Sequence, residues 1–360
     1  MNGIVYYHLK SFFDYVGDNN ARLYVSFRAL EDENGKADSM RWISAFEDMQ
    51  TDADGAIFQI GVWTEMPLLD KDYNISEWVS YVHSAVTNVN GALNISTDSY
   101  MPLNALLFPA IMETDKYNDI RYRNLPNVME LNMPFVSVVL GQEASEEVHA
   151  IQKENINNAP VSFMGVVMGC LALAYAEESI GYVDKFNLNK NDTLDNAELG
   201  FGPNGNDIDS IARIQQNVLS EKGYIIPTKY DAMEAGIYLS NDQTLSGGDY
   251  CSISRGRIIH KIRRIIRHTL LPYVHEHIYI NPQTGYMSVA DASIFVNSII
   301  NAIDQYMING DGNSQIAGKG IYIPDRQNIL ENDLLRISAE IVLLEPAVQI
   351  NIEETYTVTN

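Results

Sequence analysis

The stretch AIFQIGVW, residues 56–63, is one of four short apolar segments that decide the fold of the first half of the chain. The other three share its β-branched and aromatic residues and its flanking turn residues: ARLYVSF (21–27), ALLFPAIM (105–112) and FVSVVLG (135–141). These features are typical of strands. Between them, residues 39–50 and 75–86 space their apolar side chains like one face of a helix. The alternation predicts an α/β fold, in which helices cover a mixed and mainly parallel sheet.

The net charge limits the partners that the protein can have. The sequence carries 24 Lys and Arg against 47 Asp and Glu, a formal net charge of −23. Nucleic acid and anionic lipid would be repelled over most of such a surface, so we expect no general affinity for either. Hydrophobic residues make up 46% of the chain, enough for packed cores. The composition therefore predicts a globular protein that meets any anionic partner locally.

Neither membrane insertion nor secretion is expected. The most apolar segment, residues 161–176, is short for a membrane span and is followed directly by Glu177, so we predict a buried helix there. The opening residues MNGIVYYHLKSFF lack the charged leader and apolar stretch of a signal peptide. Cys170 and Cys251 form no disulfide framework, which favours a reducing compartment.

Changes in composition divide the chain. Residues 185–209 are rich in Asn, Asp and Gly and predict a long surface loop excursion, after which two short strands are expected within 223–242. The pattern that follows is a helix (255–271), a strand (277–280), a second helix (288–308) and three strands (320–324, 334–344 and 347–358). We therefore expect an α/β domain over residues 1–250 and an α+β domain, with two helices and antiparallel strands, over residues 251–352.

Two sequence patterns suggest metal sites but fit them poorly. NLNKNDTLDNAE, residues 187–198, has oxygen-bearing side chains at most ligand positions of a calcium loop, yet Asp192 stands where the sharp turn needs glycine. We interpret it as a solvated loop. His275 and His277 flank Glu276 without a third ligand in view, and a structural or surface role is favoured over a metal site.

Catalytic motifs are not found in the sequence. It contains no nucleophile elbow, phosphate loop or dinucleotide fingerprint, and GFGPNG (200–205) neither follows a strand nor opens a helix. We therefore expect a protein without a cofactor and without enzymatic activity. An α/β enzyme whose active site leaves no sequence pattern stays open as an alternative.

The segment RGRIIHKIRRIIRHTLLPY, residues 255–273, concentrates positive charge in this acidic chain. Its isoleucines recur on one helix face, and a second stripe at the same spacing consists of Arg257, Lys261, Arg264 and His268, with Arg267 beside it. We refer to these five residues as the basic stripe. It can be a surface that pairs locally with the acidic body, a docking surface for an acidic protein, or a nucleic-acid contact. Because no aromatic residues are interleaved with the charge, docking to an acidic protein is favoured over nucleic acid.

The order of these segments resembles that of contractile tail sheath proteins. The resemblance rests on GGDYCSISRGRIIHKIRRIIRHTLLPYV, NPQTGYMS and IPDRQNILENDLLRISAEIVLLEPAVQINIEE, and on the earlier segments VYYHLKSFFDYVGDNNARLYVSF and YIIPTKYDAMEAGIYLSNDQTLSGGDY. Such proteins occur in contractile phages, R-type pyocins and related injection systems, and the likeness is greatest to a sheath-like family of Bacteroidetes and Mu-like prophages. Members of that family usually carry a further N-terminal arm before the segment seen here.

The resemblance implies a structural subunit that forms sheath rings in a helical lattice around an acidic inner tube and contracts to drive that tube through an envelope. Baseplate and tail terminator proteins would be its other partners, and it would assemble in the bacterial cytoplasm before becoming part of a virion or phage-tail-like particle. The resemblance also implies a C-terminal strand arm, residues 353–360, exchanged between neighbours through Glu354, Thr355, Tyr356, Thr357 and Val358. The basic stripe would then contact the tube or an adjacent subunit.

Overall fold

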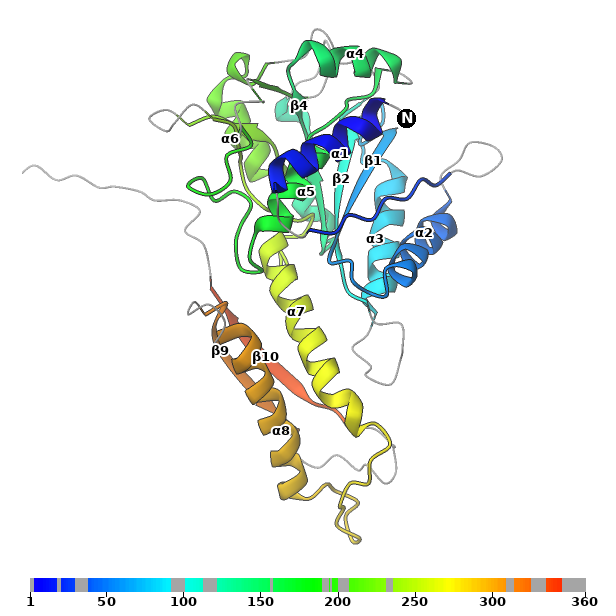
Figure 1. The fold of residues 1–360 in the computed structure, drawn as a ribbon, viewed down its shortest axis with the longest axis vertical. Coiled ribbons are helices and arrows are strands. Elements are labelled where there is room, and N and C mark those ends of the chain that lie inside the picture. Colours follow the sequence, from blue (N-terminus) through cyan, green and yellow to red (C-terminus); the bar gives the residue numbers. More distant parts are fainter. Residues whose placement is uncertain are drawn as a thin grey trace, which may run out of the picture. The chain divides into compact units, whose positions relative to one another are not determined.

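The computed structural model divides into two compact units, residues 1–277 and 278–360. The residues that it describes are 3–17, 21–29, 38–91, 101–112, 122–155, 158–189, 194, 196–199, 207–230, 236–308, 314–324 and 335–344. The first unit holds the sheet and most of the helices, and the second holds one long helix and a pair of strands (Figure 1).

A four-stranded parallel sheet forms the centre of the first unit. Its strands are β1 (Gln59–Pro67), β2 (Asn104–Ala110), β3 (Val136–Val139) and β6 (Tyr224–Ile225), in that spatial order. All seven residues of β2 are buried, as expected for a strand covered on both faces. The predicted α/β fold with a mainly parallel sheet is confirmed, and β1, β2 and β3 coincide with three of the four apolar segments.

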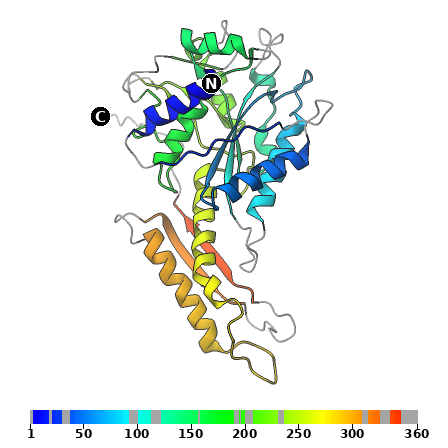
Figure 2. The ribbon, with the colours of Figure 1, turned by 45° about the vertical axis from the view of Figure 1, so that its right-hand side comes forward.

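Helices cover both faces of this sheet (Figures 1 and 2). On one face, α3 (Glu77–Asn90) packs on β2 and β3, and α2 (Ser39–Asp52) packs along α3, where Trp42 stacks on Trp78 at 5.9 Å between ring centroids. On the other face, α5 (Met164–Leu173) packs on β1, and α1 (Gly3–Val16) packs along α5. α5 is the helix predicted within residues 161–176, and its buried positions explain why that segment is so apolar.

The crossing of α1 and α5 is close because α5 places glycines against α1. A Cβ atom at Gly165 would lie 2.1 Å from Ser11 Oγ and 2.3 Å from the carbonyl oxygen of His8, which is closer than atoms can approach. Gly169 faces Tyr15 in the same way, with 3.1 Å from its virtual Cβ to the Tyr15 Cβ. These two glycines therefore set the distance between the two helices.

Short elements complete the first unit around β6. β4 (Gln142–Glu143) pairs with β5 (Ala197–Glu198), and β7 (Pro227–Thr228) pairs with β8 (Tyr238–Leu239), both antiparallel. The helices α4 (Glu146–Glu154) and α6 (Arg213–Glu221) lie in the same region, together with 3-10 turns at Tyr122–Asn124, Val128–Leu131 and Ile208–Ser210. The strands expected within residues 223–242 are thus present as β6, β7 and β8.

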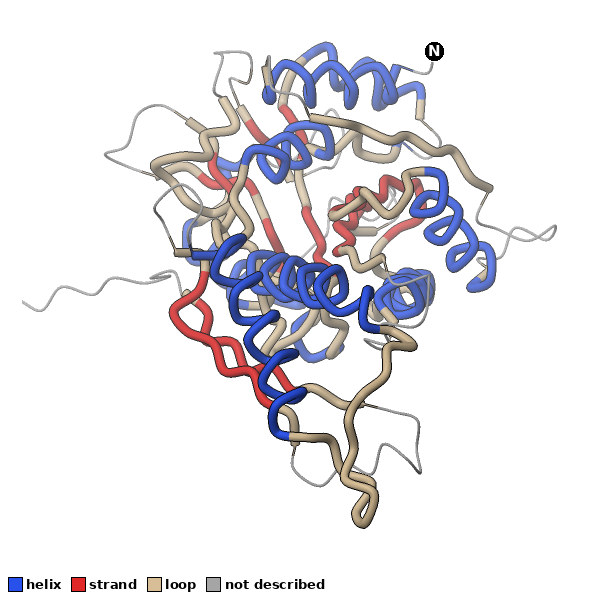
Figure 3. The backbone as a smooth tube through the Cα atoms, turned by 60° about the horizontal axis from the view of Figure 1, so that its bottom comes forward, coloured by secondary structure: helices blue, strands red, loops and turns tan. Residues whose placement is uncertain are grey.

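The second unit packs a helix on an antiparallel strand pair (Figure 3). α8 (Val289–Ile303) continues into a π-helical turn (Asp304–Ile308), and β9 (Ile316–Tyr322) pairs with β10 (Ser338–Leu343). α8 contacts β9, and the buried side chains are Phe295, Ile299, Ile303, Met307, Ile316 and Ile321. Ser288 caps α8 by accepting a hydrogen bond from the amide of Asp291 at 3.1 Å, as its sequence predicts.

The structure differs from the sequence-based expectations at three places. Residues 21–29 form no strand among the described residues, and residues 277–280 form only an isolated bridge from Ile280 to Met287. The boundary between the units lies after His277 rather than after residue 250, so α7 (Ile253–Leu270) belongs to the first unit. The reason is that side chains of α7 bind main-chain groups of the sheet domain. Residues 347–360, with the expected last strand and arm, lie outside the described residues.

We predict that Gly165→Ala destabilises the protein by about 1–3 kcal/mol, the usual cost of forcing atoms into a filled interior. The loss is expected although alanine has the better helix propensity. The free energy of unfolding from urea titration measures it. Gly247→Ala is the control, because no atom lies within 4 Å of its virtual Cβ. Equal stabilities for the two variants would contradict this account of the crossing.

Candidate functional site: the basic helix α7

The start of α7 is fixed by side chains that satisfy its free amide groups. Ser252 Oγ accepts a hydrogen bond from the amide of Arg255 at 3.2 Å. The buried Asp242 carboxylate accepts a hydrogen bond from Ser254 Oγ at 2.7 Å. A carboxylate at this position also suits the positive end of the helix. These contacts tie the first turn of α7 to the loop that follows β8.

Arg257 lies inside the first unit and caps another helix. Its Nη2 donates to the carbonyl oxygens of Leu171, at 3.2 Å, and Ala174, at 2.7 Å, at the C-terminal end of α5. Burial lowers the pKa of Arg257 to about 10, and the negative charges of Glu177, Glu178 and Asp242 oppose that shift. A cation at the negative end of a helix is favourable, and here it also satisfies two carbonyl groups that the helix leaves open.

Arg264 joins three chain segments. Nη1 donates to the carbonyl oxygen of Gly55 at 2.7 Å, and Nη2 donates to those of Ile57 at 3.2 Å and Pro102 at 2.7 Å. Its guanidinium carbon also lies 4.3 Å from the centroid of the Phe58 ring. Because these carbonyls precede β1 and β2, Arg264 fixes the starts of both strands against α7.

His260 occupies the interior between these two arginines. The residue is 1% exposed, and its ring lies 4.5 Å from the ring of Phe135, measured between centroids. Burial lowers the pKa of His260 to about 3, with smaller contributions from the charges of Arg263 and Arg264. His8 on α1 is comparable, because burial lowers its pKa to about 3 as well. Both imidazoles are therefore neutral near neutral pH.

The structure thus separates the basic stripe into two kinds of residue. Arg257 and Arg264 bind main-chain carbonyls of their own chain, a role that the sequence interpretation did not foresee. Lys261 and Arg267 are half-buried, and burial lowers the pKa of Lys261. His268 is exposed. A helical charge pattern shows which side chains share a face, whereas the carbonyl groups opposite that face come from segments distant in sequence. Sequence periodicity therefore could not identify these contacts.

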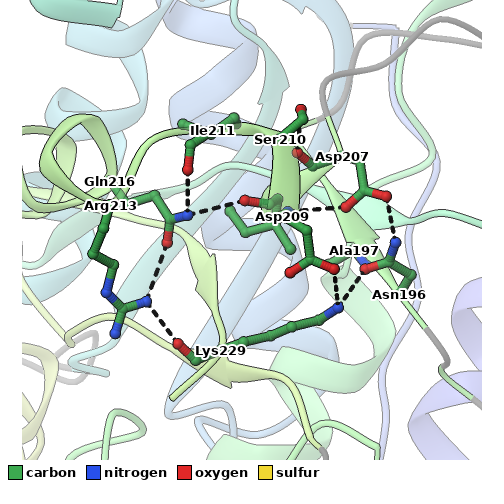
Figure 4. Close-up of polar contacts among 10 residues, drawn as sticks. Asn196, Ala197, Asp207, Asp209, Ser210, Ile211, Arg213, Gln216 and Lys229 are labelled. Carbon is green, nitrogen blue, oxygen red and sulfur yellow. Dashed lines mark hydrogen bonds and ion pairs between the residues drawn. The ribbon is translucent and has the colours of Figure 1, made fainter. Parts of the chain in front are cut away.

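A polar network holds the end of the loop excursion (Figure 4). Lys229 Nζ donates to Asp209 Oδ2 at 2.6 Å and to Asn196 Oδ1 at 2.8 Å, and Asn196 Nδ2 donates to Asp207 Oδ2 at 2.6 Å. Arg213 Nη1 donates to Thr228 Oγ1 at 2.7 Å and to the Lys229 carbonyl at 2.6 Å. Lys229, which follows β7, thus binds the end of the excursion directly, and Arg213 of α6 holds the main chain of Lys229 in place.

A buried carboxylate belongs to the same region. Glu198, 3% exposed, accepts hydrogen bonds from Gln142 Nε2 at 2.5 Å and interacts with His149 Nε2 at 2.9 Å. It stands at the twelfth position of the calcium-like pattern, but its oxygen binds side chains of β4 and α4. Within the described ranges no cluster of three or more His, Cys, Asp or Glu residues could hold a metal. In that same part of the chain, no helix is long and apolar enough to cross a membrane.

Comparison with known proteins identifies the fold. No family model matches the sequence, and no curated protein matches it. Solved structures of contractile injection particles, in contrast, contain chains with a similar fold over most of the length. A chain of the anti-feeding prophage helical sheath in its contracted state has a TM-score of 0.55 at 16% identity, with 97% of this chain and 81% of that chain covered.

A second solved structure gives the same result. A chain of the anti-feeding prophage baseplate has a TM-score of 0.53 at 16% identity, with 98% of this chain and 80% of that chain covered. At identities this low, the two structural similarities establish a common fold and nothing further. The expected resemblance to sheath proteins is therefore confirmed at the level of the fold.

We expect Arg264→Lys to lower the free energy of unfolding by about 2–3 kcal/mol, because one ammonium group cannot reach three carbonyls and each lost hydrogen bond costs about 1 kcal/mol. Chemical denaturation measures the change. Arg41→Lys is the control, since Arg41 is an exposed residue whose contact with Asp38, 3.5 Å long, a lysine can replace. A loss no larger than that of the control would show that the carbonyl contacts contribute little.

Stability should also fall as the pH decreases from about 6.5 to about 3, because His8 and His260 bind protons in the unfolded chain but not in the folded one. Each contributes a slope of about 1.4 kcal/mol per pH unit in this window and none above it. We predict that His260→Leu reduces the slope of the unfolding free energy between pH 6.5 and 5 by about that amount. Identical slopes for the variant and the wild type would refute the assignment.

Proposed function

We propose that this protein is the structural subunit of a contractile sheath, which polymerises helically around an inner tube and contracts to drive the tube through a target envelope. The observation that carries the proposal is the extent of the fold similarity. It spans 97% of the chain, so both the sheet domain and the α8–β9–β10 unit are included. A similarity confined to the α/β sheet would carry no such weight, because that architecture serves many functions.

The partners follow from the same proposal. Copies of this chain would form rings and a helical lattice, and an acidic tube protein, a baseplate and a tail terminator would complete the particle. Assembly would take place in the bacterial cytoplasm, and the product would be a virion or a phage-tail-like particle. The work of such a subunit is mechanical rather than catalytic: rigid bodies repack from an extended lattice into a shorter, wider one.

The anchoring of α7 suits that mechanical role. Arg257 and Arg264 connect α7 to the end of α5 and to the starts of β1 and β2, so the helix belongs to one rigid domain. A subunit that moves as a body needs such fixed internal contacts. Contacts to neighbours, in contrast, should be numerous and individually weak, and exposed ion pairs of about 0–1 kcal/mol each have that property.

Within the basic stripe, we assign the contact with an acidic tube or an adjacent subunit to Lys261, Arg267 and His268. Arg257 and Arg264 support the helix instead. The strand arm formed by residues 354–358 stays part of the proposal, and it would connect neighbouring subunits by main-chain hydrogen bonds. Those residues lie outside the described residues.

The proposal predicts that the purified protein forms hollow, striated cylinders in negative-stain electron microscopy, either in a concentration series or after addition of tube protein. Dispersed particles under all of these conditions would contradict the assignment.

In the same assay, the double variant Arg267→Glu with His268→Glu should form fewer tube-guided cylinders. The matched double variant Arg267→Gln with His268→Gln separates the effect of charge reversal from the loss of the side chains, and cylinders of normal number in both variants would exclude α7 as the tube contact.

A further inference from the structure

A cavity of about 700 Å³ runs along β1 in the first unit. α1 and α2 form two of its walls, β1 and α5 line its inner side, and residues 21–28 line the remaining side. The walls are mostly apolar and include Ile4, Leu9 and Phe12 of α1 and Trp42, Phe46 and Met49 of α2. The space is partly open to solvent, and it is too large to be one of the small voids found in ordinary protein interiors.

The helices around this cavity extend beyond the sheet. β1 is the outermost strand among those described, and α3 already covers β2 and β3. α2 packs along α3, so it lies beside the four strands rather than over them. On the opposite face α5 covers β1, and α1 packs along α5. Two helices that both line a space at the outer edge of β1 leave room between them for one further strand.

Residues 21–28 line this space but do not fill it. The segment is extended, and in the described part of the chain no main-chain hydrogen bond joins it to β1. Its side chains alternate as in a strand, with Leu23, Val25 and Phe27 on one side, yet Val25 is 52% exposed and Phe27 is 71% exposed. An extended segment whose amides are not bound to β1 and whose apolar groups are exposed gains by pairing with that strand edge.

We propose that residues 22–28 form a strap with two positions: unpaired over the cavity, as in this structure, and docked against the outer edge of β1 as a fifth strand. The docked strand is parallel to β1. α2 follows the strap and precedes β1 in sequence, and it lies on the same face as α3, so the strap, α2 and β1 complete a right-handed crossover of the usual kind. Docking fills the cavity with the apolar side chains of the strap.

Hydrogen exchange of the full-length protein tests the docked position. Amides of residues 22–28 that bind β1 should exchange at least about 100-fold more slowly than the same residues in an unstructured peptide. Exchange at the peptide rate for the whole segment would overturn the proposal. Light scattering is measured on the same sample, because protection that occurs only in a dimer would mean that the strap pairs with a second copy, which would also overturn it.

Substitutions provide an independent readout. In the undocked position Phe27→Asp changes an exposed side chain and should be silent, whereas docking would bury the new charge. We therefore expect Phe27→Asp to lower the melting temperature by about 3 °C or more. Ile214→Asp is the matched control, since Ile214 is 62% exposed on α6 and is not part of the cavity. Equal melting temperatures for the two variants would contradict docking, and if Phe27→Asp does not fold, the exchange of the wild-type protein decides alone.

Discussion

The interaction on which much of the first unit depends is the binding of Arg264 to the carbonyl oxygens of Gly55, Ile57 and Pro102. Parallel strands leave main-chain groups without partners at their ends, and inside a protein those groups need donors. Arginine provides several donors in a fixed plane and keeps its charge when it is buried. One side chain of α7 can therefore fix the starts of two adjacent strands, and with them the register of the sheet against the helix.

Arg257 applies the same principle to α5, the helix that packs on β1. It binds the last carbonyls of α5, the helix whose glycines allow the close crossing with α1. Together the two arginines connect α7 with β1, β2 and α5. This explains in part why so acidic a chain concentrates its basic residues on one helix. Two of those residues are structural donors, and their charge at the ends of secondary structure elements is favourable because it faces carbonyl dipoles.

A rigid sheet domain with an anchored helix suits the sheath subunit proposed above, which would move as one body in a contracting lattice. In such a machine the internal contacts must outlast the contacts between subunits. The carbonyl-bound arginines, the buried neutral His260 and the glycine-mediated crossing are contacts of the first kind, since each ties parts of one domain together and costs much to break. Side chains at the surface of α7, such as His268, are available for contacts of the second kind.

The sequence by itself determined the α/β class, the positions of β1, β2 and β3, the helices α2, α3, α5, α7 and α8, and the basic character of α7. These features depend on local periodicity and on cap residues such as Ser288, which a sequence displays directly. Only the tertiary structure decided that Arg257 and Arg264 bind carbonyls, that Glu198 is held by Gln142 and His149, and that residues 21–27 pair with no strand in the described part of the chain. Each of these facts concerns partners far apart in the chain, and no local pattern states which distant carbonyl, amide or strand edge a side chain or segment will meet.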